Sequence, residues 1–129
     1  MNRIIRSSLF LVVCLLISFN SNAQLNNNMY RIAKIKVDAN HLEQYKIALN
    51  EQMRAAIKLE PGVLSYTVVA DKKDASSITI FEVYASSEAY QSHIQAAHFK
   101  KYKETVKEMV LSLELIDTEL ITKVHKEDF

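Results

Sequence analysis

The sequence predicts an α+β domain in which four strands and two helical regions follow the order β-α-β-β-α-β. Three observations lead to this prediction. Four stretches alternate apolar and polar residues as strands do. Apolar residues between the first two stretches recur at helical spacing. The only proline and the only glycine, Pro61 and Gly62, stand together where the helix gives way to a strand.

The first predicted strand, Met29 to Val37, has Ala33, Ile35 and Val37 on one face. A helix follows, because apolar residues then recur three and four positions apart. Its apolar face is predicted to contain Leu42, Tyr45, Leu49, Met53, Ala56 and Ile57.

Pro61 and Gly62 end this helix. Pro61 disfavours the helical conformation of Glu60, and Gly62 tolerates the positive φ that often terminates helices. The next two strands, Val63 to Asp71 and Ile78 to Tyr84, flank a polar turn and are predicted to form a hairpin.

A second helical region begins after Ser86 or Ser87, either of which can cap it. A restart at His98-Phe99 indicates a break near Ala96-Ala97. The helical segment beyond the break is predicted to place Phe99, Tyr102, Val106, Met109 and Val110 together. The last strand is expected from Leu111 to Ile121, which completes a ferredoxin-like arrangement with an antiparallel sheet and helices on one face.

The two middle strands are apolar on both faces, although the helices of one chain can cover only one face. An apolar sheet face of this size is rarely left in water. We therefore predict a homodimer joined sheet to sheet. The pattern leaves open which set faces the partner: either Leu64, Tyr66 and Val68, or Val63, Thr67 and Val69.

Residues 1–23 have the pattern of an export signal, with Arg3 and Arg6 before an apolar stretch and a small-residue site ending at Ala23. The apolar stretch is too short for a bilayer core of about 30 Å. We predict cleavage after Ala23 and a periplasmic or secreted protein with no stable membrane anchor. Cleavage would also remove Cys14, the only cysteine.

The rest of the chain is predicted to contain a flexible lead (24–28), one domain (29–122) and a charged tail (123–129). Cleavage would leave 14 basic and 15 acidic residues, so nucleic acid is not an expected partner.

The stretch from Glu60-Pro61-Gly62 to His98-Phe99 resembles the antibiotic biosynthesis monooxygenase superfamily. The resemblance covers about the last hundred residues and implies a dimeric α/β barrel. It also implies oxidation of an aromatic substrate by O₂ without flavin or metal. Several haem-degrading and some polyketide-oxidising relatives rely on a pocket tryptophan. This chain has no Trp, which disfavours those two activities.

His93 and His98 are the predicted catalytic histidines, because a His-Phe pair borders the pocket in many relatives. Five positions separate them, roughly 140° around a continuous helix. They cannot bind one metal from an unbroken helix, but a break near Ala96 would let them face a common cleft. The alternative is that both are hydrogen-bonded packing residues.

Glu82 is the third candidate catalytic residue, since it interrupts an apolar strand face and must be paired, hydrated or protonated there. It could orient a histidine or accept a substrate proton, or it could be a structural link. The predicted substrate-binding residues are aromatic: Tyr66, Tyr84, Tyr90, Phe99 and Tyr102.

The sequence contains no Gly-rich loop, nucleophile elbow, clustered metal ligands or nucleotide fingerprint. We therefore expect no cofactor and no metal. The leading hypothesis is an exported, cofactor-independent monooxygenase acting on a small quinol or phenol-like substrate with O₂. One alternative is an isomerase or degrading enzyme for a small signalling molecule. Another is a non-catalytic dimeric domain that binds an aromatic or lipophilic ligand.

Overall fold

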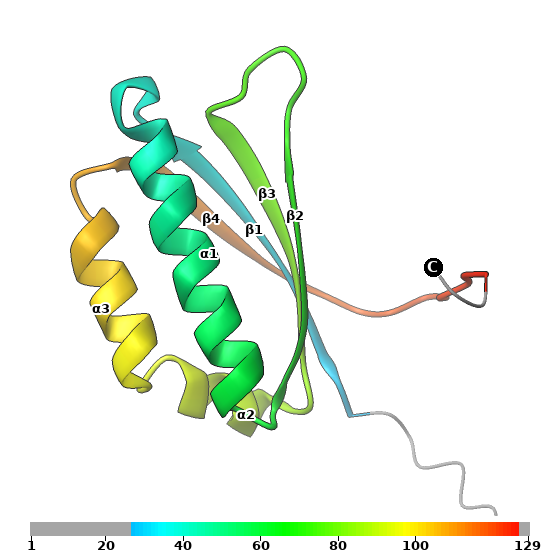
Figure 1. Cartoon of the computed structure of the whole chain (residues 1–129). Coiled ribbons are helices and arrows are strands. Elements are labelled where there is room, and N and C mark those ends of the chain that lie inside the picture. Colours follow the sequence, from blue (N-terminus) through cyan, green and yellow to red (C-terminus); the bar gives the residue numbers. More distant parts are fainter. Residues whose placement is uncertain (1–26, 127–129) are drawn as a thin grey trace, which may run out of the picture.

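The structure is a computed structural model that describes residues 27–126, so the predicted export signal lies outside the described residues. Four strands form one antiparallel sheet in the order β2-β3-β1-β4, and the helices lie on one face of it (Figure 1). The strands are β1 (Met29–Val37), β2 (Val63–Ala70), β3 (Ser77–Tyr84) and β4 (Val110–Thr118). The predicted α+β ferredoxin-like fold is confirmed, and within one chain the sheet is open rather than closed into a barrel.

Strand β1 is central and pairs with β3 on one side and β4 on the other. Ala33 lies opposite Ile80 of β3 and Leu115 of β4. Residues directly opposite each other share a face of the sheet, so these three point the same way. Ala33 and Ile80 are each 2% exposed, which places the core on the helix-covered face.

Helix α1 (Leu42–Leu59) follows a short 3-10 helix, η1 (Ala39–His41), whose cap is Asp38. Four α1 residues are buried, namely Tyr45, Leu49, Gln52 and Ala56. Ile57 was predicted on the same face, but it is 49% exposed. One residue turns an α-helix by about 100°, so Ile57 points away from the sheet where Ala56 points toward it.

Gly62 is required for a different reason from the predicted one. Its backbone is outside the positive-φ region, but a Cβ at this position would lie 2.6 Å from the Cβ of Ala89. Gly62 therefore lets the start of β2 approach helix α2 (Ser87–His93) closely. This contact fixes the position of α2, the helix that ends in His93.

The second helical region is broken as predicted. Ser86 caps α2 by accepting a hydrogen bond from the Ala89 amide at 3.1 Å, and helix α3 (Ala97–Val106) begins after a short turn. Helices α1 and α3 lie side by side across the sheet (Figure 1). In the described part of the chain, none of the helices combines the length and apolar character needed to cross a membrane.

The chain leaves α3 earlier than predicted. The helix stops at Val106, and the Met109 carbonyl accepts a hydrogen bond from the Asp38 amide at 2.8 Å, so Val110 belongs to β4 instead of the helix. Strand β4 ends at Thr118, not Ile121, because β1 has only one residue, Met29, beyond Tyr30, the partner of Thr118.

The register also resolves the faces of β2. Tyr66 lies opposite Glu82 and Val68 opposite Ile80, which places them on the helix-covered face. Thr67 and Val69 lie on the other face. The register shifts between Val63 and Ser65, so Val63 instead joins a buried cluster with Ala56 and Tyr84. The uncovered face includes Val69 and Phe81, which are 48% and 45% exposed.

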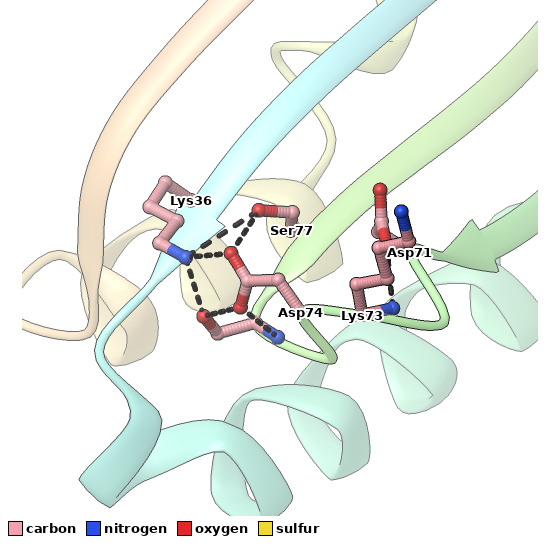
Figure 2. Close-up of polar contacts among 6 residues, drawn as sticks. Lys36, Asp71, Lys73, Asp74 and Ser77 are labelled. Atoms are coloured by element: carbon pink, nitrogen blue, oxygen red, sulfur yellow. Dashed lines mark hydrogen bonds and ion pairs between the residues drawn. The ribbon is translucent and has the colours of Figure 1, made fainter.

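The turn between β2 and β3 carries a polar network at the far end of the sheet (Figure 2). The Lys36 ammonium forms an ion pair with Asp74 and donates to Ser76 Oγ at 2.8 Å. The hydroxyls of Ser76 and Ser77 each donate to Asp74 at 2.7 Å. These contacts hold the hairpin turn against β1.

Candidate functional site

A cavity of about 300 Å³ lies between the helix-covered face of the sheet and the three α-helices. Its walls are mainly apolar and aromatic. The side chains that can donate or accept hydrogen bonds at its wall are Gln52, Tyr66, Glu82, Tyr84, Tyr90, His93, Tyr102 and Lys103. A cavity of this kind, apolar with a few convergent polar groups, is typical of a small-molecule site.

His93 is almost fully buried in this site, at 2% exposure. Its Nδ1 lies 2.8 Å from Glu60 Oε2, and its Nε2 lies 3.2 Å from both Gln52 Nε2 and the Tyr66 hydroxyl. The Gln52 amide nitrogen can only donate. His93 Nε2 is therefore the acceptor, and Nδ1 carries the proton that is donated to Glu60.

Glu60 also accepts a hydrogen bond from His98, whose Nε2 lies 2.6 Å from the same Oε2 atom. The helix break makes this arrangement possible, because His93 ends α2 and His98 lies in the first turn of α3. One carboxylate oxygen thus joins the two predicted histidines. This carboxylate is Glu60, whereas the sequence analysis offered Glu82 as the one that could orient a histidine.

Glu60 was missed because it was interpreted only as the residue where α1 ends. A signal was present in the sequence, however. A carboxylate at a helix C-terminus faces the negative end of the helix dipole, so it favours a cationic or hydrogen-bond-donating partner. Gln52 was missed because a glutamine within a helix usually faces water.

Glu82 lies on the cavity wall and accepts a hydrogen bond from the Tyr84 hydroxyl at 3.1 Å. Burial raises the pKa of Glu82, while the Tyr84 hydrogen bond and the charge of Arg31 act in the opposite direction. Burial also raises the pKa of Tyr66 to about 12, and that of Tyr84 above its usual range. The two phenols therefore keep their protons and donate hydrogen bonds, Tyr66 to His93 and Tyr84 to Glu82.

The five aromatic residues predicted to bind substrate all line the cavity. Phe99 packs against the His93 ring with 4.8 Å between centroids, and Tyr90 packs against Tyr84 at 5.3 Å. The Tyr102 hydroxyl is hydrogen bonded to that of Tyr45 at 2.8 Å. Of the three predicted catalytic residues, His93 and Glu82 line the cavity.

His98 does not line this cavity and instead borders a shallow groove between α1 and α3. It contacts the site through Glu60 and through the His93 ring, with 6.1 Å between the two ring centroids. The donor atoms of Glu60, His93 and His98 lie within 4.8 Å of one another, a set that could hold a metal ion. No metal was expected from the sequence, because clustered metal ligands are not visible in it and the two histidines are not spaced for one continuous helix.

The fold and the cavity together define a small ferredoxin-like domain with an aromatic pocket and one buried histidine held by a carboxylate. A family model described as antibiotic biosynthesis monooxygenase matches residues 29–105. The chain belongs to this family, as the resemblance of its sequence implied.

Solved structures support the same assignment. A protein of Bacteroides thetaiotaomicron, provisionally named an antibiotic biosynthesis monooxygenase, is 44% identical. The match covers 79% of this chain and 97% of that one, with a TM-score of 0.74. A provisionally named monooxygenase of Lactobacillus acidophilus is 28% identical over 70% of this chain and 43% of its own, with a TM-score of 0.69.

Among curated proteins, an uncharacterised protein of Synechocystis is 31% identical over 70 residues. The match covers 54% of this chain and 47% of that relative, so the chain spans about half the relative's length.

Proposed function

We propose that this protein is a cofactor-independent monooxygenase that oxidises a small quinol or phenol-like compound with O₂. The cavity supports this proposal, because its size and aromatic walls suit a substrate with one or a few rings. The names of the related structures point to the same reaction class.

The observation that carries the proposal is the unprotonated Nε2 of His93 at the cavity wall. Glu60 fixes the ring from the other side through Nδ1, the arrangement by which a carboxylate orients a catalytic histidine in hydrolytic triads. The Tyr66 hydroxyl lies 3.2 Å from this nitrogen and 3.4 Å from the Tyr84 hydroxyl, and all three residues line the cavity. Tyr66 can pass its proton to His93 and take one from the substrate hydroxyl, which leaves a phenolate in the cavity.

The phenolate then supplies the electrons. It transfers one electron to O₂, and the resulting radical pair combines to form a carbon–oxygen bond. The hydroperoxide loses water, so a hydroquinone and O₂ give a hydroxyquinone and H₂O. Both reducing electrons come from the substrate. The Tyr66 hydroxyl, which carries the proton taken from the substrate, can donate a hydrogen bond to the oxyanion as charge develops.

The decisive experiment is oxygen consumption with a panel of hydroquinones, comparing the wild type with His93→Gln and His41→Gln. His41 lies in η1, at the opposite end of α1 from Glu60, and so provides a matched control. A general base contributes about 10²–10⁴-fold, and we expect a loss of that size only in His93→Gln. A loss below about threefold in a folded variant would assign His93 to packing.

A non-catalytic binding domain is the second candidate, and one observation favours it. His93 Nε2 already accepts from two partners, Gln52 and Tyr66, as a structural histidine would. Binding of aromatic ligands without oxygen consumption in the same panel would select this function.

The isomerase alternative has less support. A phosphorylated substrate needs cationic groups at the cavity, but Arg31 is held by Asp117 at 2.6 Å and Arg54 is hydrogen bonded to Asn50. Lys103 is the one Lys or Arg among the described residues that line the cavity.

We also propose that the domain is a homodimer joined through the uncovered face of the sheet. The exposed Val69 and Phe81 on that face favour a partner, and the cavity lies on the opposite, helix-covered face. Light scattering should give twice the monomer mass at micromolar concentration, and a well-folded monomer would refute the dimer.

Export with cleavage after Ala23 is part of the same proposal. Mass spectrometry of the protein from a secreting host should find a chain that begins at Gln24. A mature protein that still begins at Met1 would contradict it.

A further inference from the structure

We propose that Glu60, His93 and His98 form a binding site for a divalent transition metal ion such as Zn²⁺, and that the bound ion prevents His93 from accepting a proton. The second part rests on the function proposed above, whereas the first does not. The inference begins from the convergence of one carboxylate oxygen and two imidazole nitrogens at the junction of α1, α2 and α3.

The donor set is suited to this class of ion. Two histidine nitrogens and one glutamate oxygen, with water as a fourth ligand, form a known type of zinc site. Bonds of about 2.0–2.1 Å in a tetrahedron separate neighbouring donors by about 3.3 Å. The present separations from Glu60 Oε2 are 2.8 Å to His93 and 2.6 Å to His98. The two histidine nitrogens lie within 4.8 Å of each other, so side-chain shifts that lengthen both contacts to Oε2 would admit the ion.

The site can be reached from outside the cavity. Glu60 and His98 side chains are 15% and 17% exposed, compared with 2% for His93. His98 borders the groove between α1 and α3, where Glu51 also lies. An ion can therefore enter beside His98 and meet His93 Nδ1 from the side of the ring that faces away from the cavity.

Binding at Nδ1 changes the other nitrogen of the same ring. His93 now donates from Nδ1 and accepts at Nε2, as its contact with the Gln52 amide requires. A metal at Nδ1 needs the lone pair there, so the ring proton must move to Nε2. The number of protons on the ring is unchanged. Nε2 then becomes a donor toward Tyr66 and, once the Gln52 amide turns to present its oxygen, toward Gln52. It can no longer take a proton from Tyr66 or substrate.

The first test is titration of the protein with Zn²⁺ and with Co²⁺ by calorimetry and absorption. The protein must be prepared without a polyhistidine tag. We expect one ion per chain and cobalt absorption bands typical of four ligands. Substitution of a residue that only supports a metal ligand typically weakens metal binding by about 10–100-fold. Glu60→Gln and His98→Asn remove a ligand itself, so each should weaken binding by at least this factor.

His41→Gln is the matched control, because His41 Nδ1 lies 3.6 Å from Asp38 and belongs to no group of three donors among residues 27–126. It should bind the metal as the wild type does. Equal binding by wild type and His98→Asn, or binding lost equally in His41→Gln, would overturn the site.

The second test records the tautomer of His93 by ¹⁵N NMR, which needs no substrate. Without metal, we expect the proton on Nδ1, and with one equivalent of Zn²⁺ on Nε2. An unchanged tautomer in a protein that binds Zn²⁺ would overturn the proposed block. If metal binds and the tautomer changes while no hydroquinone is oxidised, the metal site stands and the proposed enzyme function fails.

Discussion

The two ends of the sheet each hold a carboxylate in a hydrogen-bonded network, but the surroundings of the two carboxylates differ. At the hairpin end, Asp74 receives hydrogen bonds from Lys36, Ser76 and Ser77 in contact with water (Figure 2). At the cavity end, Glu82 receives one from Tyr84 and stands on a mainly apolar wall.

The pKa values move in opposite directions as a result. The hydrogen bonds from Lys36 and the two serines hold the pKa of Asp74 well below its usual range. Burial raises that of Glu82, and a single phenol donor does not offset it. The hairpin network stabilises a charge that water also reaches. The cavity network instead holds polar groups away from water, and burial of this kind shifts pKa values as functional sites often require.

The largest expected effect comes from disturbing the packing of α2 against the start of β2, because this changes the cavity end of the sheet and not the hairpin end. Gly62→Ala places a methyl group 2.6 Å from the Ala89 Cβ, and overpacking of this kind costs about 1–3 kcal/mol. We expect a lower free energy of unfolding in urea and faster amide exchange around His93. Exchange in the hairpin turn near Asp74 should be unchanged.

The control for this variant is the double substitution Gly62→Ala with Ala89→Gly, which removes the clash. Glycine within a helix costs about 1 kcal/mol by itself. The double variant should therefore lose less stability than the sum of the single losses. Simple additivity would show that the two residues do not clash.

Removal of one hydroxyl at each end of the sheet measures how much burial strengthens a hydrogen bond in the two networks. Tyr66→Phe deletes the hydrogen bond to His93, and we expect a loss of about 0.5–1.5 kcal/mol of unfolding free energy. Ser77→Ala deletes a hydroxyl beside the more exposed Asp74, where water can replace it, so its loss should be smaller. Equal losses in urea denaturation would mean that burial does not distinguish the two networks.

Glu82→Gln tests the sign of the effect of burial on a charge. The folded-state pKa of Glu82 lies above the ordinary value of 4.5. Its contribution to stability is therefore fully present below about pH 4.5 and is lost as pH rises through the folded-state pKa. The variant should gain stability relative to wild type between pH 4 and pH 7. Denaturation curves at both pH values measure this change, and a variant that loses relative stability would contradict it.

Asp74→Asn should show the smallest effect, with the opposite dependence on pH. The folded-state pKa of Asp74 is lowered, so its stabilising contribution is present above the unfolded value of 3.8 and is lost as pH falls through the folded value. Wild type should be more stable than the variant at pH 7, and the difference should shrink below pH 4. A stability difference between wild type and variant that stays constant with pH would show that the Asp74 charge does not contribute to stability.

The fold was predictable because each element carries its own local signal. Alternation along β1 and β3 and the Pro61-Gly62 pair fix strand and turn positions without knowledge of tertiary contacts. The errors occur where tertiary contacts decide. Strand β4 ends at Thr118 because β1 has only Met29 beyond the partner of Thr118, and Gly62 is needed because Ala89 lies nearby.

The site was predictable only in part. His93 was identified because a His-Phe pair borders the pocket in many relatives, and the aromatic residues were identified because they come from elements that flank the expected cavity. Glu60 lies 33 positions from His93 along the chain. Its contact with both histidines depends on the angle between α1 and the broken second helical region, which no local pattern records.

The central place of β1 has a consequence for folding kinetics. Its first residues pair with the last residues of the sheet, since the Thr118 hydroxyl donates to the Tyr30 carbonyl across 88 positions of sequence. Contacts this distant slow folding, because the entropy of closing the loop is lost before the pairing is gained. During synthesis, one edge of β1 stays unpaired until residues 110–118 have left the ribosome, so the native sheet cannot be completed before then.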